Sequence, residues 1–146
     1  MTIVYHKGIV KYDFGNGHPF RGERFPRYMD IIDSHGLLGE GGMILFEPEP
    51  ATDEDLAMVH TQEYIERIMR LAENYGMLTG DTPLNPSIVE AARLIVGSGI
   101  KSANLIMEGG YNLIDSVGGG LHHAGPDYGG GFCVFNDVAL CGKTLL

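Results

Sequence analysis

Short apolar stretches alternate along this chain with longer segments in which apolar residues recur every three or four positions. The stretches from Thr2 to Tyr5 and from Met43 to Phe46 are rich in β-branched, aliphatic and aromatic residues, and glycine or proline follows each of them. We therefore predict a short strand at both places. Leu113, Ile114 and Val117 predict a third, buried strand that leads into a glycine cluster.

Helical spacing predicts several helices between and after these strands. The segment from Arg24 to His35 has an apolar stripe that stops before a glycine, and Ser87 to about Met107 is a long, largely apolar helical segment. Thr52 and Thr61 each stand where they can cap a following helix. A last helix can run from Asp137 through Leu146.

Three details of the pattern bear on local structure. Gly97 and Gly99 either break the long helix or let it pack closely against a neighbour. Asp55 only partly imitates the acidic residue of a capping box. The segment from Gly76 to Pro86 is expected to be irregular, and Asp81 within it is most simply a turn residue.

The alternation of predicted strands and helices indicates an α/β fold with a parallel sheet. The 146 residues have the length of one domain. Ligands of such folds bind beyond the carboxyl ends of the strands, and the segment after the third predicted strand carries His122 and His123. This edge of the sheet is therefore the expected site.

Charge and composition narrow the range of partners and compartments. A net charge of −9 disfavours contact with a phosphate backbone, so no direct nucleic-acid partner is expected, and it is compatible with a cationic substrate. The only two cysteines, Cys133 and Cys141, form neither a CxxC pair nor a secreted framework, which favours a reducing cytoplasm. No apolar run approaches the length of a membrane helix, so no membrane partner is expected.

The candidate chemistry is concentrated between Gly118 and Asp137. The sequence GGGLHHAGPDYGGGFCVFND places two adjacent histidines between glycine clusters, which mark loops. Adjacent residues of an extended segment point to opposite faces, so His122 and His123 are poorly placed to hold one metal ion together. A shared proton-transfer task and a structural role, in which the rings satisfy buried hydrogen bonds, are both open.

Other candidate motifs are weaker. Asp33 and His35 have the spacing of an Asp-x-His metal pair, but on a helix such side chains point about 200° apart. Gly142-Lys143-Thr144 has the form of a P-loop ending but lacks the required first glycine. Cys133 has no identifiable base partner, and His18 is most simply a histidine that is hydrogen-bonded inside a turn.

Several motifs together resemble those of one family. GGGLHHA followed by GGGFCVFND is similar to the tandem-histidine and glycine-phenylalanine-cysteine motifs of the histone deacetylase superfamily, which includes bacterial acetoin-utilisation proteins. GNGHPFRGER looks like that family's GHP-x-x-x-x-Arg segment, and HTQEYI resembles its His-x-x-x-Tyr-Ile helix start. The resemblance implies a three-layer α/β/α arginase/deacetylase-like parallel sheet that is incomplete in this chain, with residues 1–146 as the N-terminal part of a single domain.

The resemblance also implies a function and roles for individual residues. The expected activity is that of a zinc-dependent amidohydrolase that removes acetyl groups from acetyl-lysine or a similar acylated amine, such as an acetylpolyamine. The family's general base and then acid corresponds to His123, and His122 corresponds to the histidine that assists it electrostatically. Gly131 and Phe132 correspond to residues that line the family's acyl-lysine tunnel. Asp81 corresponds to the rim aspartate that holds the substrate backbone, and Arg24 corresponds to the arginine of the inner acetate channel.

The family's metal ligands have no counterpart in these residues. Its members carry an Asp-x-His pair on the strand after this last helix, a further metal aspartate and a transition-state tyrosine, and the carboxylates that orient the two histidines are also missing here. We therefore expect the isolated chain to bind no zinc tightly and to be inactive alone. The alternative is a non-catalytic interaction module that associates with itself or a partner through its exposed sheet.

Overall fold

The computed structural model describes residues 1–146, and a parallel sheet of three strands lies at its centre. Strand β1 (Thr2–Val4) lies between β2 (Ile44–Phe46) and β5 (Ile114–Ser116) and runs parallel to both, as predicted. A 3-10 helix, η1 (Lys7–Lys11), follows β1 and was not indicated by the sequence pattern. The third strand is not fully buried, since β5 forms an edge of the sheet and Leu113 before it is exposed.

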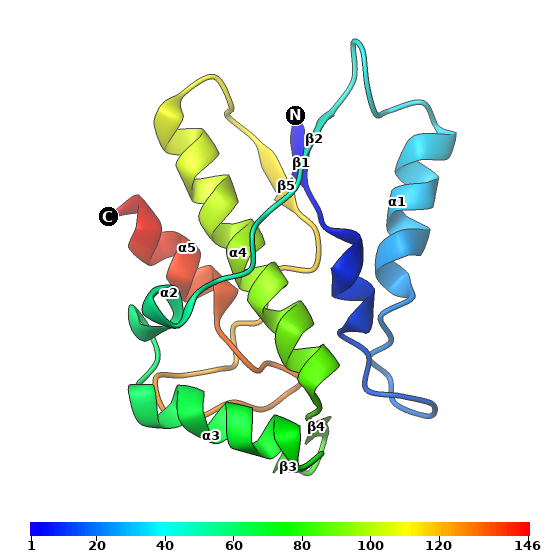
Figure 1. Ribbon diagram of the computed structural model, residues 1–146. Helices are drawn as coiled ribbons and strands as arrows, with labels where there is room; N and C mark the ends of the chain where they lie inside the picture. Colours follow the sequence, from blue (N-terminus) through cyan, green and yellow to red (C-terminus); the bar gives the residue numbers. More distant parts are fainter.

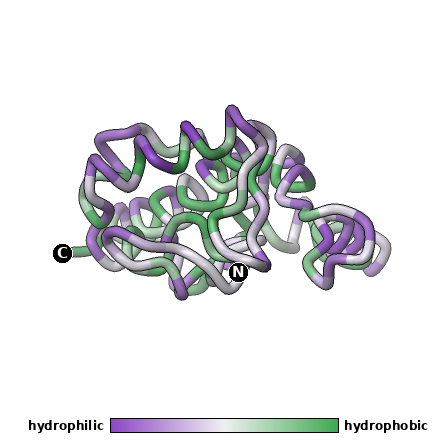
Figure 2. Tube along the Cα trace, turned by 90° about the horizontal axis from the view of Figure 1, so that it is seen from below, coloured by the Kyte–Doolittle hydropathy of each residue, from purple (hydrophilic) through white to green (hydrophobic).

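Helices lie on both sides of the sheet. Figure 1 shows the strands between the long helix α4 (Pro86–Glu108) and helix α1 (Arg24–Ser34), which gives three layers. Seen from below, α1 stands at one side of the molecule and carries both polar and apolar residues (Figure 2). Its buried Phe25, Met29 and Ile32 belong to the hydrophobic core. No helix of the structure has the length and apolar character that crossing a membrane requires.

The remaining helices pack beside α4. Helices α2 (Asp53–Ala57) and α3 (Gln62–Glu73) precede it, and α5 (Asp137–Leu145) packs along it near the end of the chain (Figure 1). The predicted caps are confirmed, because the hydroxyl groups of Thr52 and Thr61 each accept a backbone N–H from the first turn of the helix that follows. The helix starts can therefore be read directly from these two threonines.

Two local features differ from the sequence-based expectation. Asp55 forms a full capping box rather than a partial one, because its carboxylate accepts the backbone N–H of Thr52 at 2.8 Å. The segment from Gly76 to Pro86, expected to be irregular, contains an antiparallel hairpin of β3 (Met77–Thr79) and β4 (Thr82–Pro83). Strands of two or three residues are too short to show an alternating pattern in the sequence.

Helix α4 is continuous through Gly97 and Gly99, which serve close packing rather than a break. A Cβ at Gly97 would lie 1.8 Å from the carbonyl oxygen of Glu49, and one at Gly99 would lie 3.2 Å from the carbonyl oxygen of Asp137. The two glycines therefore let the preceding segment and α5 approach the axis of α4.

We expect Gly97→Ala to lower the free energy of unfolding by roughly 1–3 kcal/mol, because the added methyl collides with backbone and forces the chain at Glu49 away from α4. Gly142→Ala is the matched control. Gly142 lies in α5 with open space at its Cβ, so the change is expected to be neutral or to stabilise by up to about 1 kcal/mol through helix propensity. Urea denaturation followed by circular dichroism measures both, and a Gly97→Ala protein as stable as the wild type would contradict the close packing.

Candidate active site

The loop between β5 and α5, residues 117–136, carries the tandem histidines. Six of its apolar side chains are buried in the core, while His122 and His123 are exposed. The alternative in which both rings satisfy buried hydrogen bonds therefore does not describe them. The buried apolar side chains of the loop are Val117, Leu121, Ala124, Cys133, Val134 and Phe135.

The two imidazole rings lie side by side. Their centroids are 4.3 Å apart, because His122 and His123 form a turn and not the extended segment in which neighbours point to opposite faces. The ring of His122 bonds through Nδ1 to the carbonyl oxygen of Gly120 at 2.8 Å. In the neutral ring Nδ1 therefore carries the proton, and Nε2 is left as the acceptor.

A pocket of about 410 Å³ adjoins this turn. It brings together five of the six site residues predicted from the sequence: His122, His123, Gly131, Phe132 and Arg24. The sixth, Asp81, does not line it. The remaining lining residues are Phe20, Phe25, Gly118, Gly119, Gly120, Leu121 and Cys133.

Phe132 is held in an unusual backbone conformation. Its φ of 70° lies in the left-handed region that side chains other than glycine rarely adopt. The Tyr12 hydroxyl donates to its carbonyl oxygen at 2.5 Å and accepts the N–H of Val134 at 3.2 Å, and the Thr82 hydroxyl accepts the N–H of Phe132 at 3.1 Å. Tyr12 and Thr82 are fully buried, and burial raises the pKa of the Tyr12 hydroxyl, which stays protonated and able to donate.

His18 connects the ring of Phe132 to the β3–β4 hairpin. The two rings lie 4.8 Å apart in an edge-to-face arrangement. Nδ1 of His18 accepts the N–H of Phe20 at 2.9 Å, so its Nε2 donates to the carbonyl oxygen of Asp81 at 2.8 Å. The predicted hydrogen-bonded turn is confirmed, and the second bond adds a contact with a distant segment.

Asp81 lies at the end of this connection. The hydroxyls of Thr79 and Thr82 donate to its carboxylate at 2.6 and 2.9 Å, and these bonds lower the pKa of Asp81. The carboxylate is therefore ionised at neutral pH. It is separated from the histidine pocket by the rings of His18 and Phe132.

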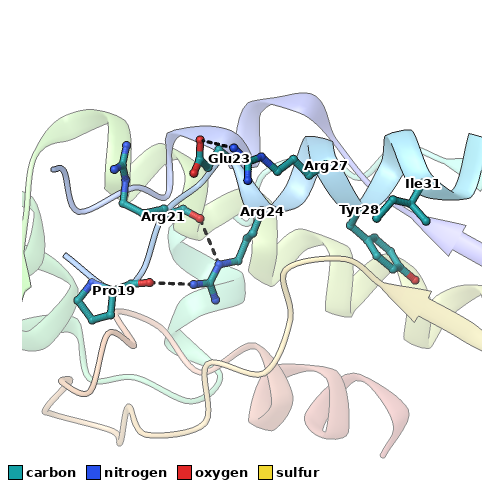
Figure 3. A pocket seen from close by; sticks show the side chains of 7 residues that line it. All are labelled: Pro19, Arg21, Glu23, Arg24, Arg27, Tyr28 and Ile31. Atoms are coloured by element: carbon teal, nitrogen blue, oxygen red, sulfur yellow. Dashed lines mark hydrogen bonds and ion pairs between the residues drawn. The ribbon is translucent and has the colours of Figure 1, made fainter. Parts of the chain in front are cut away.

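Arg24 lines two pockets. Its guanidinium donates to the carbonyl oxygens of Pro19 and Arg21 at 3.0 and 3.1 Å (Figure 3). It also lies 4.3 Å from the ring centroid of Phe20. One pocket is the histidine pocket, and the other has a volume of about 470 Å³. The second is lined by Pro19, Arg21, Glu23, Arg24, Arg27, Tyr28 and Ile31.

His60 anchors the far side of the loop and was not singled out as a site residue from the sequence. It is buried, and its Nδ1 bonds to the carbonyl oxygen of Gly125 at 2.8 Å while Nε2 accepts the N–H of Asn136 at 3.1 Å. Burial lowers the pKa of His60, which keeps the ring neutral, as the accepted N–H bond requires. Its place at the start of the HTQEYI motif was the available signal.

The residues of this chain do not by themselves fit a metal ion. No three His, Cys, Asp or Glu side chains gather where they could hold one. Asp33 and His35 are exposed, and the ring of His35 bonds to the carbonyl oxygen of Ile31 in its own helix. Cys133 is buried, and burial raises its thiol pKa, so it lacks the thiolate character of a ligand or nucleophile.

Known proteins match this chain over nearly its whole length. The family model for the histone deacetylase domain matches residues 18–146. The acetoin utilization protein AcuC of Bacillus subtilis is 33% identical over 149 residues, which cover 95% of this chain and 38% of that protein. A probable deacetylase of Archaeoglobus fulgidus is 32% identical over 148 residues, covering 99% and 40%. The chain therefore spans about two fifths of the length of these relatives.

Solved structures share the fold. The HDA15 HD domain superposes with a TM-score of 0.87 at 23% identity, covering 99% of this chain and 42% of that one. An HDAC homolog complexed with SAHA gives a TM-score of 0.82 at 23% identity, covering 99% and 41%. The predicted arginase/deacetylase-like fold is confirmed, and the three-stranded sheet is a part of the complete domain.

We expect the free energy of unfolding to decrease as the pH falls below about 6.5, the ordinary pKa of histidine. The folded chain keeps His60 neutral because its pKa is lowered, whereas the unfolded chain takes up a proton near 6.5. The stabilisation is complete above that value and is lost toward the lower folded pKa. Urea denaturation at several pH values should show a smaller pH dependence for His60→Gln, while His35→Gln, at an exposed position, should keep the wild-type slope.

We expect Tyr12→Phe to lower the free energy of unfolding by about 1–3 kcal/mol, because the carbonyl of Phe132 and the N–H of Val134 lose a buried partner. The N–H of Val134 should also exchange with solvent faster in hydrogen-exchange NMR. Tyr128→Phe removes an exposed hydroxyl from the same loop and should change neither quantity. Unchanged exchange at Val134 in Tyr12→Phe would show that Tyr12 does not hold this segment.

Proposed function

The chain belongs to the histone deacetylase family, and we propose that its residues serve a zinc-dependent amidohydrolase that removes acetyl groups from acetyl-lysine or a similar acylated amine. Deacetylases of this family are generally zinc-dependent. The observation that carries the proposal is the gathering of two exposed, adjacent histidines with Gly131 and Phe132 around one pocket. The unpaired cysteines suit a reducing compartment such as the cytoplasm.

In this proposal His123 transfers the proton and His122 assists. His123 accepts a proton from the water that attacks the acetyl carbonyl, and it then gives a proton to the departing amine. One C–O bond forms and the amide C–N bond breaks, which releases acetate and a free amine. The neighbouring ring of His122 lies 4.3 Å away, and its Nδ1–H is held by the carbonyl oxygen of Gly120, so its Nε2 can assist as a hydrogen-bond acceptor.

The walls of the pocket suit an extended acyl-amine. Gly131 leaves room beside His123, since a Cβ there would lie 3.2 Å from Cδ2 of that ring. The ring of Phe132 offers an apolar surface for a methylene chain. The ionised carboxylate of Asp81, beyond Phe132 and His18, can accept N–H groups from the backbone of a peptide substrate. The chain's net charge of −9 favours a substrate that carries further positive charge.

Arg24 is proposed to guide acetate away from the reaction. It lies at both the histidine pocket and the second pocket, so an anion that moves from one to the other passes its guanidinium. Two carbonyl oxygens hold that group in place (Figure 3), and the ring of Phe20 packs against it. A fixed, permanently charged guanidinium suits transient contact with a carboxylate.

Zinc ligation is assigned to residues other than these 146. The chain brings no three metal-ligating side chains together and spans about two fifths of the relatives that it matches. The isolated chain is accordingly proposed to bind zinc weakly and to be inactive alone.

A second candidate function is a non-catalytic module that pairs with another copy of the chain. The observation that favours it is the exposure of both sheet edges: β2 and β5 have no outer neighbour, and Ile44, Leu45 and Leu113 are 51%, 43% and 61% exposed. Unpaired edges with apolar side chains promote strand pairing between chains. Sizing on a calibrated column separates the candidates, since the module requires a concentration-dependent dimer.

We expect the purified 146-residue chain to contain no stoichiometric zinc and to leave a fluorogenic acetyl-lysine substrate uncleaved. Metal analysis and the fluorescence assay measure both, and full zinc occupancy with robust turnover would contradict the assignment. Reading the coding DNA past codon 146 for an Asp-x-His strand tests the deacetylase proposal. In a protein extended by that sequence, His123→Ala should reduce kcat about 10²- to 10⁴-fold, and His35→Ala, far from the pocket, should not.

A further inference from the structure

Only two side chains of the carboxylate and imidazole types are buried in this chain, and both contact the histidine loop. They are Asp137, 4% exposed, and His60, 3% exposed. Burial of an ionisable group is costly unless its hydrogen bonds are satisfied. Of the 19 acidic residues, Asp137 alone is buried, and the sequence pattern indicated it only as the start of the last helix. The burial of this carboxylate next to the histidine turn therefore suggests that it has a specific role there.

The carboxylate of Asp137 accepts backbone N–H groups from the residues just before the histidines. Leu121 donates to Oδ1 at 2.7 Å, and Gly120 donates to Oδ2 at 3.0 Å. Gly119 lets the carboxylate come this close, because a Cβ there would lie 2.8 Å from Oδ2. No basic side chain pairs with Asp137, so these N–H groups and its position in the first turn of α5 are its stabilising partners.

The same peptide group also contacts the ring of His122. The carbonyl of Gly120 and the N–H of Leu121 belong to one peptide unit, which is planar and rigid. Its N–H donates to Asp137, and its carbonyl oxygen accepts from Nδ1 of His122 at 2.8 Å. Asp137, this peptide and the imidazole therefore form a continuous chain of hydrogen bonds, in which each bond polarises the next.

Asn136 holds the other side of the turn. Its side-chain amide donates to the carbonyl oxygen of Ala124 at 2.8 Å and to that of His122 at 3.4 Å. Its own backbone N–H is fixed by Nε2 of His60. Asn136 and Asp137, at the start of α5, therefore hydrogen-bond to the backbone on both sides of the two histidines.

We propose that Asp137 is a positioning residue that fixes the tautomer and orientation of His122 through the Gly120–Leu121 peptide. Burial raises the pKa of Asp137, and the N–H groups of Gly120 and Leu121 oppose that rise by stabilising the charged form. When ionised, the carboxylate strengthens the carbonyl of Gly120 as an acceptor and so favours the proton on Nδ1 of His122. Nε2 is then presented as an acceptor toward the pocket. The functional meaning of this inference rests on the proposed proton-transfer role of the tandem histidines. The chain of hydrogen bonds does not depend on that role, because all its members lie within these 146 residues.

The test is NMR spectroscopy of the ¹³C,¹⁵N-labelled chain. The wild type should show mainly the Nδ1–H tautomer at His122, together with a scalar coupling across the hydrogen bond from the N–H of Leu121 to the side-chain carboxyl carbon of Asp137. Asp137→Asn, which keeps one acceptor oxygen but no charge, should shift the tautomer ratio of His122 toward Nε2–H by about three- to tenfold. Asp137→Ala should shift it further and should speed amide exchange at Leu121 about tenfold or more.

Asp127→Asn is the matched control, because Asp127 is an exposed aspartate of the same loop and should leave the His122 ratio unchanged. The scalar coupling is measured on the wild type, so it tests the hydrogen bond between Leu121 and Asp137 even if a variant unfolds. Absence of the coupling would refute that hydrogen bond. An unchanged His122 tautomer in a folded Asp137→Asn protein would refute the relay. If the relay is present and the extended protein does not cleave acetyl-lysine, the proposed function fails and this inference stands.

Discussion

A glycine-rich loop can carry a precise site only if its backbone N–H and carbonyl groups find partners, and here buried side chains supply them. Tyr12 bonds to the backbone at Phe132 and Val134, Tyr64 to Val134, His60 to Gly125 and Asn136, and Asp137 to Gly120 and Leu121. These side chains come from segments at the beginning, middle and end of the sequence. The loop between β5 and α5 is consequently fixed without any strand of its own.

This arrangement keeps the backbone of the loop fixed while the tandem histidines stay accessible to solvent. Six apolar side chains of the loop are buried, and buried side chains bond to its backbone, so the tandem histidines are exposed on a backbone that is held in place. Phe132 keeps a left-handed backbone because Tyr12 and Thr82 over-determine it. Strain and polar burial are thus concentrated at the wall and floor of one pocket, as is common at functional sites.

The scaffold allows this by close packing around α4. Gly97 and Gly99 bring the segment at Glu49 and the start of α5 against the helix, and α5 in turn places Asn136 and Asp137 under the histidine turn. The sheet itself is small, with only β1 shielded on both edges. The solved chains that share this fold are more than twice as long as these 146 residues.

Local sequence signals determined much of this molecule. The spacing of apolar residues predicted helices α1, α3 and α4, and the threonines Thr52 and Thr61 indicated where two helices start. The histidine and glycine motifs indicated both the family and the site. Each of these signals depends on residues that are near one another in the chain. The strands of the hairpin after Gly76 are too short to show a period. The roles of Gly97, Tyr12 and Asp137 depend on contacts with residues 16 to 122 positions away. Only the tertiary structure could decide those, since hydrogen bonds and packing between distant segments leave no periodic trace in a single sequence.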